Sequence, residues 1–333
     1  MNERRGKVAW GLIALLPILF YLAVVIGRYG LLPKETLQVL FGGDGIPEVI
    51  RAVIVRVRVP RALAAACIGA NLAVCGALFQ GLFRNPLVDS RILGVSAGAA
   101  FGAAIGLLFS MGPLLVQGSA FAFALVAVGL VWLVGRRFGS ATLILVVAGI
   151  LISALFNALL GLTKYVADPL STLPAITYWL LGGLSGTRWG GLPPLLILTG
   201  TGLALCFLIR WRLNLLTLSE GEARSLGVRV RGFRLAVIAI GTVLAAVSVA
   251  TAGMIGWIGL IVPHVARAWV GPDHTRLIPV SAGLGAALVL VLDTIARTAL
   301  PSEIPLGILT GLLGVPAFFA LFLRFMRTKE ERR

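Results

Sequence analysis

Residues 214–231, with the sequence NLLTLSEGEARSLGVRVR, interrupt a long apolar part of the chain. Apolar runs flank this stretch on both sides, at about residues 192–210 and 233–252. Within the stretch, apolar side chains recur at spacings of three to five, which predicts a short amphipathic helix. These apolar positions are Leu215, Leu218, Ala223 and Leu226.

The ends of this predicted helix are also marked in the sequence. Ser219 is a candidate N-cap with Glu222 three residues later, the arrangement of a capping box, and Gly227 is a candidate C-terminal stop. A short charged helix between two membrane-crossing runs would give a soluble partner a place to hold. A plain solvated loop is the competing interpretation, and the composition of the stretch does not separate the two.

The composition of the whole chain predicts an all-α polytopic membrane protein. Of its 333 residues 59% are apolar and 13% are charged, and the mean hydropathy is +1.00. A soluble domain is about 45–50% apolar and about 25% charged. The apolar runs follow one another closely, so we expect a single transmembrane domain over residues 1–333, built as one helical bundle. The first run follows a basic start and is too long for a cleaved signal, which predicts a retained span.

Ten apolar segments have roughly the length needed to cross a membrane, and a shorter apolar piece at about 171–184 predicts a surface or re-entrant helix. The ten segments are about 8–27, 62–83, 92–109, 113–135, 142–162, 192–210, 233–252, 256–270, 277–297 and 305–325.

The basic residues predict the orientation of these spans. On this layout, 20 of the 29 Lys and Arg residues lie on the side of the two termini and nine lie on the other side. The positive-inside rule then places both termini and the stretch 214–231 in the cytoplasm. The net charge of +16 is therefore expected to meet membrane headgroups rather than nucleic acid. Six of the nine outer charges lie between Arg28 and Arg61, a cluster that calls for a functional reason.

A glycine pattern in the third span predicts close helix packing. Gly94, Gly98, Gly102 and Gly106 recur at spacing four, which would let another helix approach backbone to backbone. A smooth face for a helix that moves is the functional alternative.

Few polar residues lie inside the spans. Asp293 is the clearest ionisable one, and we interpret it as hydrogen-bonded to a neighbouring helix, so that Asp293→Asn is expected to be tolerated. Asn71, Gln80 and Asn157 also predict hydrogen bonds between helices. The three cysteines (Cys67, Cys75 and Cys206) fall within apolar runs without a CxxC pair, which favours buried side chains over a disulfide or a metal site.

Enzymatic functions find little support in the sequence. It has no HExxH, no Ser/His/Asp set, only two His residues and no G-x-x-x-x-G-K-[ST] nucleotide-binding motif. A transporter driven by protons or sodium is the main alternative to an ATP-driven one, and it predicts that Asp293 is essential. A membrane enzyme acting on lipid-linked substrates would need a polar catalytic cluster at one interface, which the sequence does not suggest.

Eight motifs, in order from about residue 55 to the C-terminus, resemble the FecCD-type permeases of bacterial ABC importers for iron-siderophores, haem and cobalamin. They are RVPR (58–61), GALFQG with RNPLVD (76–81 and 84–89), LGVSAGA (93–99), YWLLGG (178–183), LSEGEARSLGV (218–228), GWIGLIVPHVAR (256–267), DTIAR (293–297) and EIPLGILTGLLGVP (303–316). Two positions depart from the usual pattern of the family, which has Leu at residue 59 and often Phe at Trp257.

The resemblance implies a type II importer permease with ten spans in the bacterial inner membrane. It implies a pathway between two copies, lined mainly by the second, third, fifth and tenth spans. Two ATP-binding cassette subunits would hold ATP and Mg on the cytoplasmic side, and a periplasmic binding protein would dock on the outer side. It implies no cofactor or metal on this chain. The cargo would be an iron chelate, with ferric siderophore ahead of haem and cobalamin.

The resemblance also implies roles for particular residues. Arg58, Arg61 and Arg297 match the arginines that pair with glutamates of the binding protein, a contact that sets docking register and association rate. Asn85, Pro86, Leu87 and Thr142 match the cytoplasmic gates. The helix that couples to the ATPase maps onto Leu215, Leu218, Ser219, Glu220, Gly221, Glu222, Ala223, Arg224, Ser225, Leu226 and Gly227.

Overall fold

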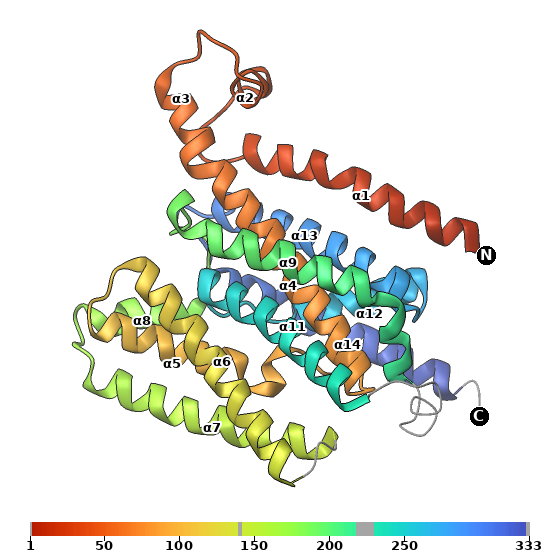
Figure 1. The fold of residues 1–333 in the computed structure, drawn as a ribbon. Helices are drawn as coiled ribbons and strands as arrows, with labels where there is room; N and C mark the ends of the chain where they lie inside the picture. Colours follow the sequence, from red (N-terminus) through yellow and green to blue (C-terminus); the bar gives the residue numbers. More distant parts are fainter. Residues whose placement is uncertain (1, 139–141, 218–229, 331–333) are drawn as a thin grey trace.

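The computed structural model describes residues 2–138, 142–217 and 230–330, and this part of the chain is helical without a strand (Figure 1). The elements in order are α1 (Asn2–Val25), α2 (Pro33–Leu40), α3 (Glu48–Ala52), the π-helical turn η1 (Val53–Arg58), α4 (Val59–Leu82), the 3-10 turn η2 (Ser90–Leu93), α5 (Val95–Leu108), α6 (Pro113–Phe138), α7 (Thr142–Val166), α8 (Thr172–Leu181), η3 (Trp189–Gly191), α9 (Leu192–Leu213), η4 (Asn214–Thr217), α11 (Val230–Ala252), α12 (Ile258–Val270), α13 (His274–Thr298) and α14 (Leu306–Glu330).

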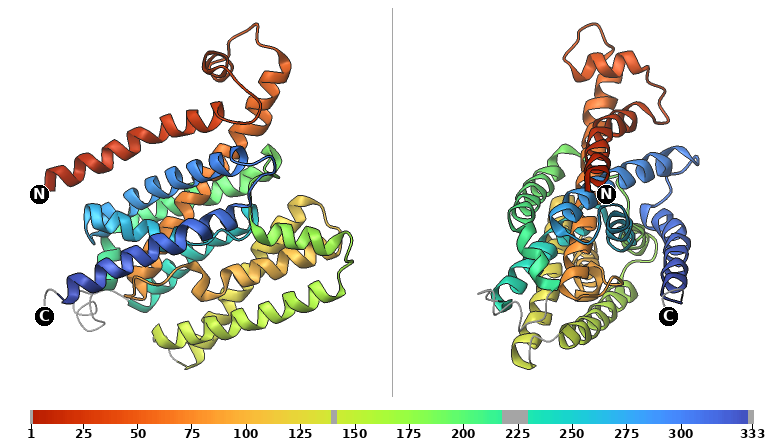
Figure 2. Two further views of the ribbon diagram at one scale, coloured as in Figure 1. Left: turned by 180° about the vertical axis from the view of Figure 1, so that it is seen from behind. Right: turned by 90° about the vertical axis from the view of Figure 1, so that its right-hand side faces the viewer.

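Each of the ten predicted spans coincides with a helix, which confirms the predicted all-helical membrane fold. The short helix predicted near 171–184 is α8. Among the described residues, six helical segments are long and apolar enough to cross a membrane. The two ends of the chain lie toward one end of the bundle, opposite α2 and α3, as an even number of spans requires (Figures 1 and 2).

Two of the predicted spans are helices of only partial length. α5 has 14 residues and α12 has 13, and each therefore rises about 20 Å, less than the roughly 30 Å of a hydrocarbon core. Irregular segments precede both, at 83–94 and 253–257. Such backbone is tolerated at membrane depth only where protein covers it and supplies its hydrogen bonds. The chain does so near 253–257, where the Gly183 amide donates to the Ala252 carbonyl at 2.8 Å.

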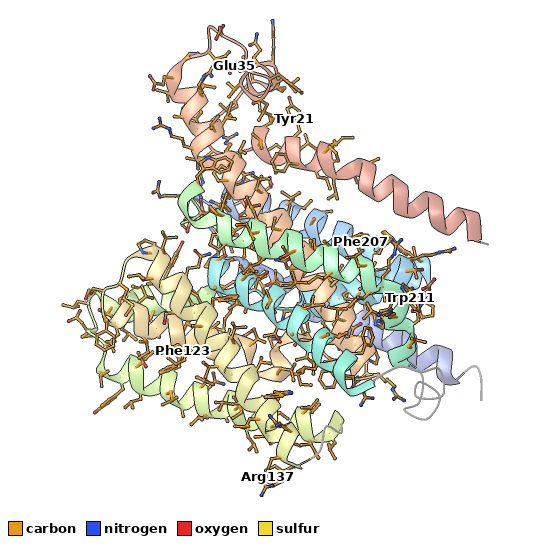
Figure 3. All side chains as sticks on the ribbon, in the orientation of Figure 1. Tyr21, Glu35, Phe123, Arg137, Phe207 and Trp211 are labelled. Atoms are coloured by element: carbon orange, nitrogen blue, oxygen red, sulfur yellow. The ribbon has the colours of Figure 1, made fainter. Side chains whose placement is uncertain are left out.

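The region between the first two spans, where six of the predicted outer charges lie, is largely helical. It forms α2, α3 and η1, and residues Glu48–Leu82 make one continuous helical rod of 35 residues, roughly 50 Å long. Charged residues along this region conceal its helical character from a hydropathy reading. The Tyr21 hydroxyl donates to the Pro33 carbonyl at 2.9 Å and holds α2 against α1 (Figure 3).

An apolar hollow of about 500 Å³ lies beneath α2. Side chains of α1, α2, α4 and α13 line it, among them Phe20, Leu37, Ala66 and Leu290. Its lining offers little that could select a polar cargo. It also lies away from the helices expected to line the pathway, apart from α4.

α4 forms the centre of the bundle, because glycines let two other helices contact its backbone. Gly69 meets the backbone of α13 at Gly285, and Gly76 meets that of α12 at Gly259, with no room for a Cβ at either position. In the third span, Gly98, Gly102 and Gly106 likewise face α6 closely. Gly94 does not belong to this row. It precedes α5 with a left-handed φ of 79° and ends the turn η2.

Candidate functional site

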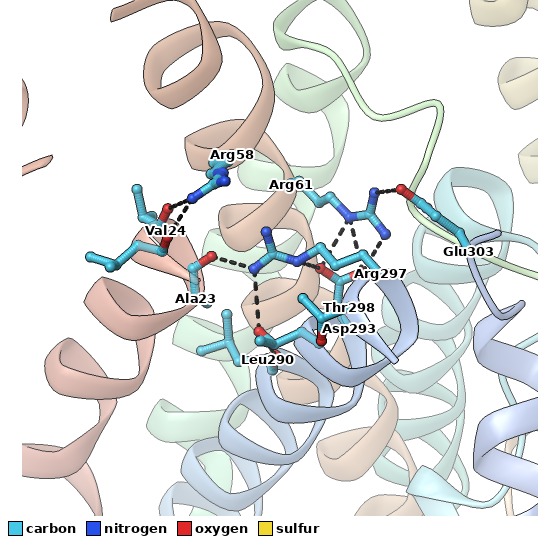
Figure 4. A network of polar contacts seen from close by, with 11 residues as sticks. Ala23, Val24, Arg58, Arg61, Leu290, Asp293, Arg297, Thr298 and Glu303 are labelled. Atoms are coloured by element: carbon cyan, nitrogen blue, oxygen red, sulfur yellow. Dashed lines mark hydrogen bonds and ion pairs between the residues drawn. The ribbon is translucent and has the colours of Figure 1, made fainter. Parts of the chain in front are cut away.

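A cluster of buried charges lies at the end of the bundle away from the two chain ends, the predicted outer end, where the rod of α3, η1 and α4 passes the ends of α1 and α13 (Figure 4). We call it the outer arginine cluster, and it consists of Arg58, Arg61, Asp293, Arg297 and Glu303. The π-helical turn adds a residue just before α4, and Arg58 closes that turn. Arg58 and Arg61 are three residues apart and so share one face of the rod.

Asp293 is the central acceptor of the outer arginine cluster. The Arg61 guanidinium donates to its carboxylate from Nε at 3.0 Å and from Nη2 at 2.9 Å, while Arg61 Nη1 donates to Glu303 at 2.9 Å. Arg297, one turn further along α13, lies 3.5 Å from Asp293. Asp293 is 3% exposed. The predicted hydrogen bond between Asp293 and a neighbouring helix is therefore confirmed.

The other two arginines cap the C-terminal end of α1. Arg58 donates to the carbonyl of Val24 at 2.8 Å and also reaches that of Tyr29, and Arg297 donates to the carbonyl of Ala23. The last carbonyls of a helix lack partners within it and carry roughly half a negative charge, so guanidinium groups stabilise them. Three cations thus face two carboxylates and one helix end, and the charges nearly balance.

The three arginines predicted to dock the binding protein are buried in this cluster. Arg58, Arg61 and Arg297 are each less than 10% exposed and are bonded within the chain, whereas a docking surface was expected to present them. Glu303 is the more open member, with 31% of its side chain exposed. Docking through these arginines stays a prediction.

The predicted cytoplasmic gate lies on the exposed turn that follows α4. The Asn85 side chain accepts from the Leu87 amide at 2.9 Å, and Asn85, Pro86 and Leu87 are all exposed. Arg84 starts the turn with a φ of 47°. The other gate residue, Thr142, begins α7. The structure places these residues without testing whether they gate.

The entrance to the stretch 214–231 is fixed to the bundle by polar contacts. The Asn214 side chain donates to Asp273 at 2.7 Å and accepts from the backbone amide of His274 at 2.8 Å. Burial raises the pKa of Asp273, but hydrogen bonds from Thr275 and Asn214 outweigh burial and hold that pKa below its ordinary value. His274 packs against Gly81 near the end of α4, so the entrance, α13 and α4 meet at one point.

Of the residues predicted to couple to an ATPase, only Leu215 lies within the described residues, in η4. Leu218, Ser219, Glu220, Gly221, Glu222, Ala223, Arg224, Ser225, Leu226 and Gly227 lie outside them.

Two of the three amides predicted to bond between helices do so. Asn71 donates to Thr199 at 2.8 Å and to Ser248 at 3.2 Å, which joins α4 to α9 and α11. Gln80 donates to the Gly259 and Leu260 carbonyls and accepts from Arg267 at 3.0 Å. The prediction is wrong for Asn157, which is exposed on α7 and whose side chain has no hydrogen bond to another described residue.

Comparison with known families decides what this bundle is. The sequence matches the FecCD transport family over residues 15–324. The chain belongs to the FecCD transport family. As a member, it is a permease subunit of an ABC importer and is not itself an ATPase.

Individual relatives of this FecCD-family permease cover nearly its whole length. It is 39% identical to the molybdate import system permease protein MolB of Haemophilus influenzae, over 96% of each chain. It is 41% identical to the hemin transport system permease protein HmuU of Yersinia pestis, over 83% of this chain and 84% of that one. A solved inward-facing conformation of a putative metal-chelate type ABC transporter matches with a TM-score of 0.88 at 37% identity, covering 96% of this chain and 99% of that one.

Several structural features of this FecCD-family permease were missed by the sequence reasoning. The capping of α1 by Arg58 and Arg297 needs three distant segments and leaves no local signal. One partner of the Asn214–Asp273 contact could have been predicted from the sequence, because an Asp just before a span is a common N-cap signal. Arg91 was counted among the charges on the side of the termini, and its position over the Trp257 ring was not foreseen.

Proposed function

We propose that this chain is the membrane-spanning subunit of an ATP-driven importer that passes a metal-bearing cargo from a binding protein into the cell. A ferric siderophore is the leading cargo, with haem, cobalamin and molybdate as the other candidates. The observation that carries the proposal is the family match over residues 15–324, together with a chain that has no nucleotide-binding motif of its own. The energy for uphill transport would then come from a separate ATPase.

The proposed assembly has two copies of this chain, two ATPase subunits and one periplasmic binding protein in the bacterial inner membrane. The bias of Lys and Arg toward the side of the termini supports cytoplasmic termini. ATP binding would close the ATPases and move the stretch 214–231. It can shift the permease only if ATP binds one arrangement of the complex more tightly than the other.

A proton- or sodium-coupled carrier is the alternative, and the surroundings of Asp293 count against it. A coupling acid must exchange its ion with a path, but Asp293 is almost fully buried and its carboxylate is bonded to Arg61. Among the described residues, the carboxylate near Asp293 is that of Glu303, and it also pairs with Arg61.

Uptake into vesicles tests the proposed function. Proteoliposomes holding the permease and its ATPase, with binding protein outside and ATP inside, should accumulate one of the four cargoes. Uptake should stop when the Walker A lysine of the ATPase is replaced and should persist with a protonophore. Uptake that needs an ion gradient and survives the ATPase variant would refute the proposal.

The proposed docking of the binding protein can be tested through its association rate and its dissociation rate. Charge reversal at Arg61 should raise the dissociation rate of the binding protein, because the proposed pairing with a glutamate of that protein is lost. Charge reversal at the exposed Arg56 should mainly lower the association rate, in a salt-dependent way. Surface plasmon resonance on the permease in nanodiscs measures both rates. Unchanged kinetics in the Arg61→Glu variant, with normal folding, would remove Arg61 from the docking site.

Deletion of residues 219–227 tests the coupling role. The shortened permease should remain folded and lose co-purification with the ATPase. The ATPase should still co-purify after deletion of the six residues 41–46, which lie in the segment between α2 and α3. Retained co-purification with the 219–227 deletion would exclude this stretch as the coupling element.

A further inference from the structure

Arg91 lies in the turn between α4 and α5, at a depth unusual for an exposed arginine. Its neighbour Asp89 lies beside Gly259, which itself contacts the α4 backbone between Leu72 and Gly76. Six residues separate Gly76 from the end of α4 at Leu82, so Asp89 and Arg91 lie roughly 9 Å inside the bundle from that end. The Arg91 side chain is nevertheless 48% exposed.

The position of Arg91 is set from three sides. Asp89 accepts from Arg91 Nε at 2.7 Å and from the Arg91 amide at 3.0 Å, which fixes the inner edge of the guanidinium. The guanidinium carbon lies 5.7 Å from the centre of the Trp257 ring, a cation–π distance. Nη1 and Nη2 have no hydrogen bond to any other described residue, so the outer edge of the fork is available.

Trp257 adopts an unusual backbone conformation to hold its ring there. Its φ of 70° is left-handed, which a bulky residue rarely adopts, and such outliers are found preferentially at functional sites. The ring is also wedged between Arg91 and α14, where it packs closely against Gly314 and lies 6.1 Å from the Phe318 ring. A strained aromatic residue and a guanidinium edge without a bond to another described residue are thus two independent observations at one place.

This place lies between two of the helices expected to line the pathway. Gly149 of α7 contacts the backbone of Ile92, and Gly314 of α14 contacts Trp257. The turn that holds Arg91 runs between α14 and α7 in Figure 2 (left). Both helices expose many large apolar side chains, so Arg91 is a cation between two largely apolar helices.

We propose that the free edge of Arg91, oriented by Asp89 and Trp257, contacts an oxyanion group of the cargo as it passes. The cargo class is a metal species with exposed negative oxygens, either a tetrahedral metal oxyanion or a ferric chelate with carboxylates. A planar guanidinium fork pairs with such oxygens through two parallel hydrogen bonds. Asp89 offsets part of the charge, and a passage site must bind weakly enough to release its cargo.

This inference rests on the proposed function, and transport of matched cargoes tests it. The vesicle system described above would be supplied with molybdate, ferric citrate and an uncharged ferric trihydroxamate. Arg91→Gln should lower uptake of the transported anionic cargo about tenfold at subsaturating concentration, the effect of about 1.4 kcal/mol. Arg91→Lys should recover part of the loss, because it keeps the charge and loses the fork.

Arg136 provides the matched control. It is also an exposed arginine over a tryptophan, 5.6 Å from the Trp132 ring, but it lies at the end of α6. Arg136→Gln should leave uptake unchanged, and Arg91→Gln should keep the ATP hydrolysis that binding protein stimulates, which shows an assembled complex.

Three outcomes would overturn the inference. Equal uptake of the anionic cargo by wild type and Arg91→Gln would do so, as would an equal loss for the uncharged cargo, which would make Arg91 structural. Wild-type uptake of the trihydroxamate alone would also overturn it while leaving the proposed function intact. Absence of ATP-dependent uptake by the wild type of these three cargoes, and of haem and cobalamin in the same vesicles, would instead reject the proposed function and the inference with it.

Discussion

Asp293→Asn isolates the charge of the outer arginine cluster, because asparagine has nearly the same shape as aspartate. Asp293 accepts from Arg61 at 2.9 and 3.0 Å and lies 3.5 Å from Arg297. Removing one partner of a buried ion pair costs about 3–5 kcal/mol, since the remaining charge is left uncompensated. Asparagine still accepts one hydrogen bond and Glu303 still faces Arg61, so we expect a loss of about 3 kcal/mol, at the lower end of that range.

The structure thus revises the expectation that Asp293→Asn is tolerated. One kcal/mol shifts the melting temperature by about 2–4 °C in domains of 150–250 residues and by less in longer chains, so a fall on the order of 5 °C is expected. A thiol-reactive dye can follow unfolding, because Cys75 and Cys206 are buried and unpaired in the folded bundle. The assay is run on the purified permease in detergent.

Asp89→Asn is the matched control for this measurement. Its carboxylate pairs with the half-exposed Arg91, and pairs of that kind contribute about 0–1 kcal/mol. A melting temperature for Asp293→Asn no lower than that of Asp89→Asn would refute the reasoning. A second check is the double variant Arg61→Gln with Asp293→Asn, whose loss should be smaller than the two single losses added together. Strict additivity would mean that the two residues are not coupled.

Two further changes test the packing and the capping. Gly76→Ala should destabilise the bundle by about 1–3 kcal/mol, because the added Cβ would meet the Gly259 backbone. Gly161→Ala, on the open face of α7, is the control and should be neutral or slightly stabilising. A lower melting temperature for Gly161→Ala than for Gly76→Ala, followed with the thiol-reactive dye, would contradict the contact between Gly76 and Gly259. Asp273→Ala should cost about 1 kcal/mol through loss of the α13 N-cap. The pKa of Asp273 is lowered in the folded chain, so its contribution to stability should be fully present above pH 3.8, its ordinary pKa, and should vanish as pH falls through the lowered pKa. A difference in stability between wild type and Asp273→Ala that grows in acid would contradict this.

Hydropathy sufficed to predict the spans because lipid imposes one rule on every helix that crosses it. The partial lengths of α5 and α12 escaped this reading, since their neighbouring segments are also rich in apolar and small residues. Trp257 shows the difficulty: it stands in an apolar run, and only its backbone angle reveals that the helix has not yet begun.

The burial of the charged residues could not be predicted from the sequence. A count of Lys and Arg places Arg58, Arg61 and Arg297 outside the membrane but cannot tell a paired arginine from a free one. The partners come from residues up to 274 positions away along the chain, as in the contact between Arg297 and Ala23. Arg91 is the opposite case, because its charge was counted for the side of the termini, and the count could not show that its side chain lies against Trp257 and stays half-exposed.

The rod of α3, η1 and α4 differs from α7 in how firmly the bundle holds it, and this difference limits which parts can move. The apolar portion of the Glu48–Leu82 rod is 83% buried, and the outer arginine cluster ties it to α1 and α13, so relative motion there would break buried ion pairs. The apolar portion of α7 is only 22% buried and contacts the bundle along one face. Its inner end lies beside the turn that carries Arg91 through the contact of Gly149 with Ile92. A movement that opens the inner end would therefore displace α7 and the Arg91 turn together while the outer cluster stays closed, which couples release of the cargo to loss of its contact with Arg91.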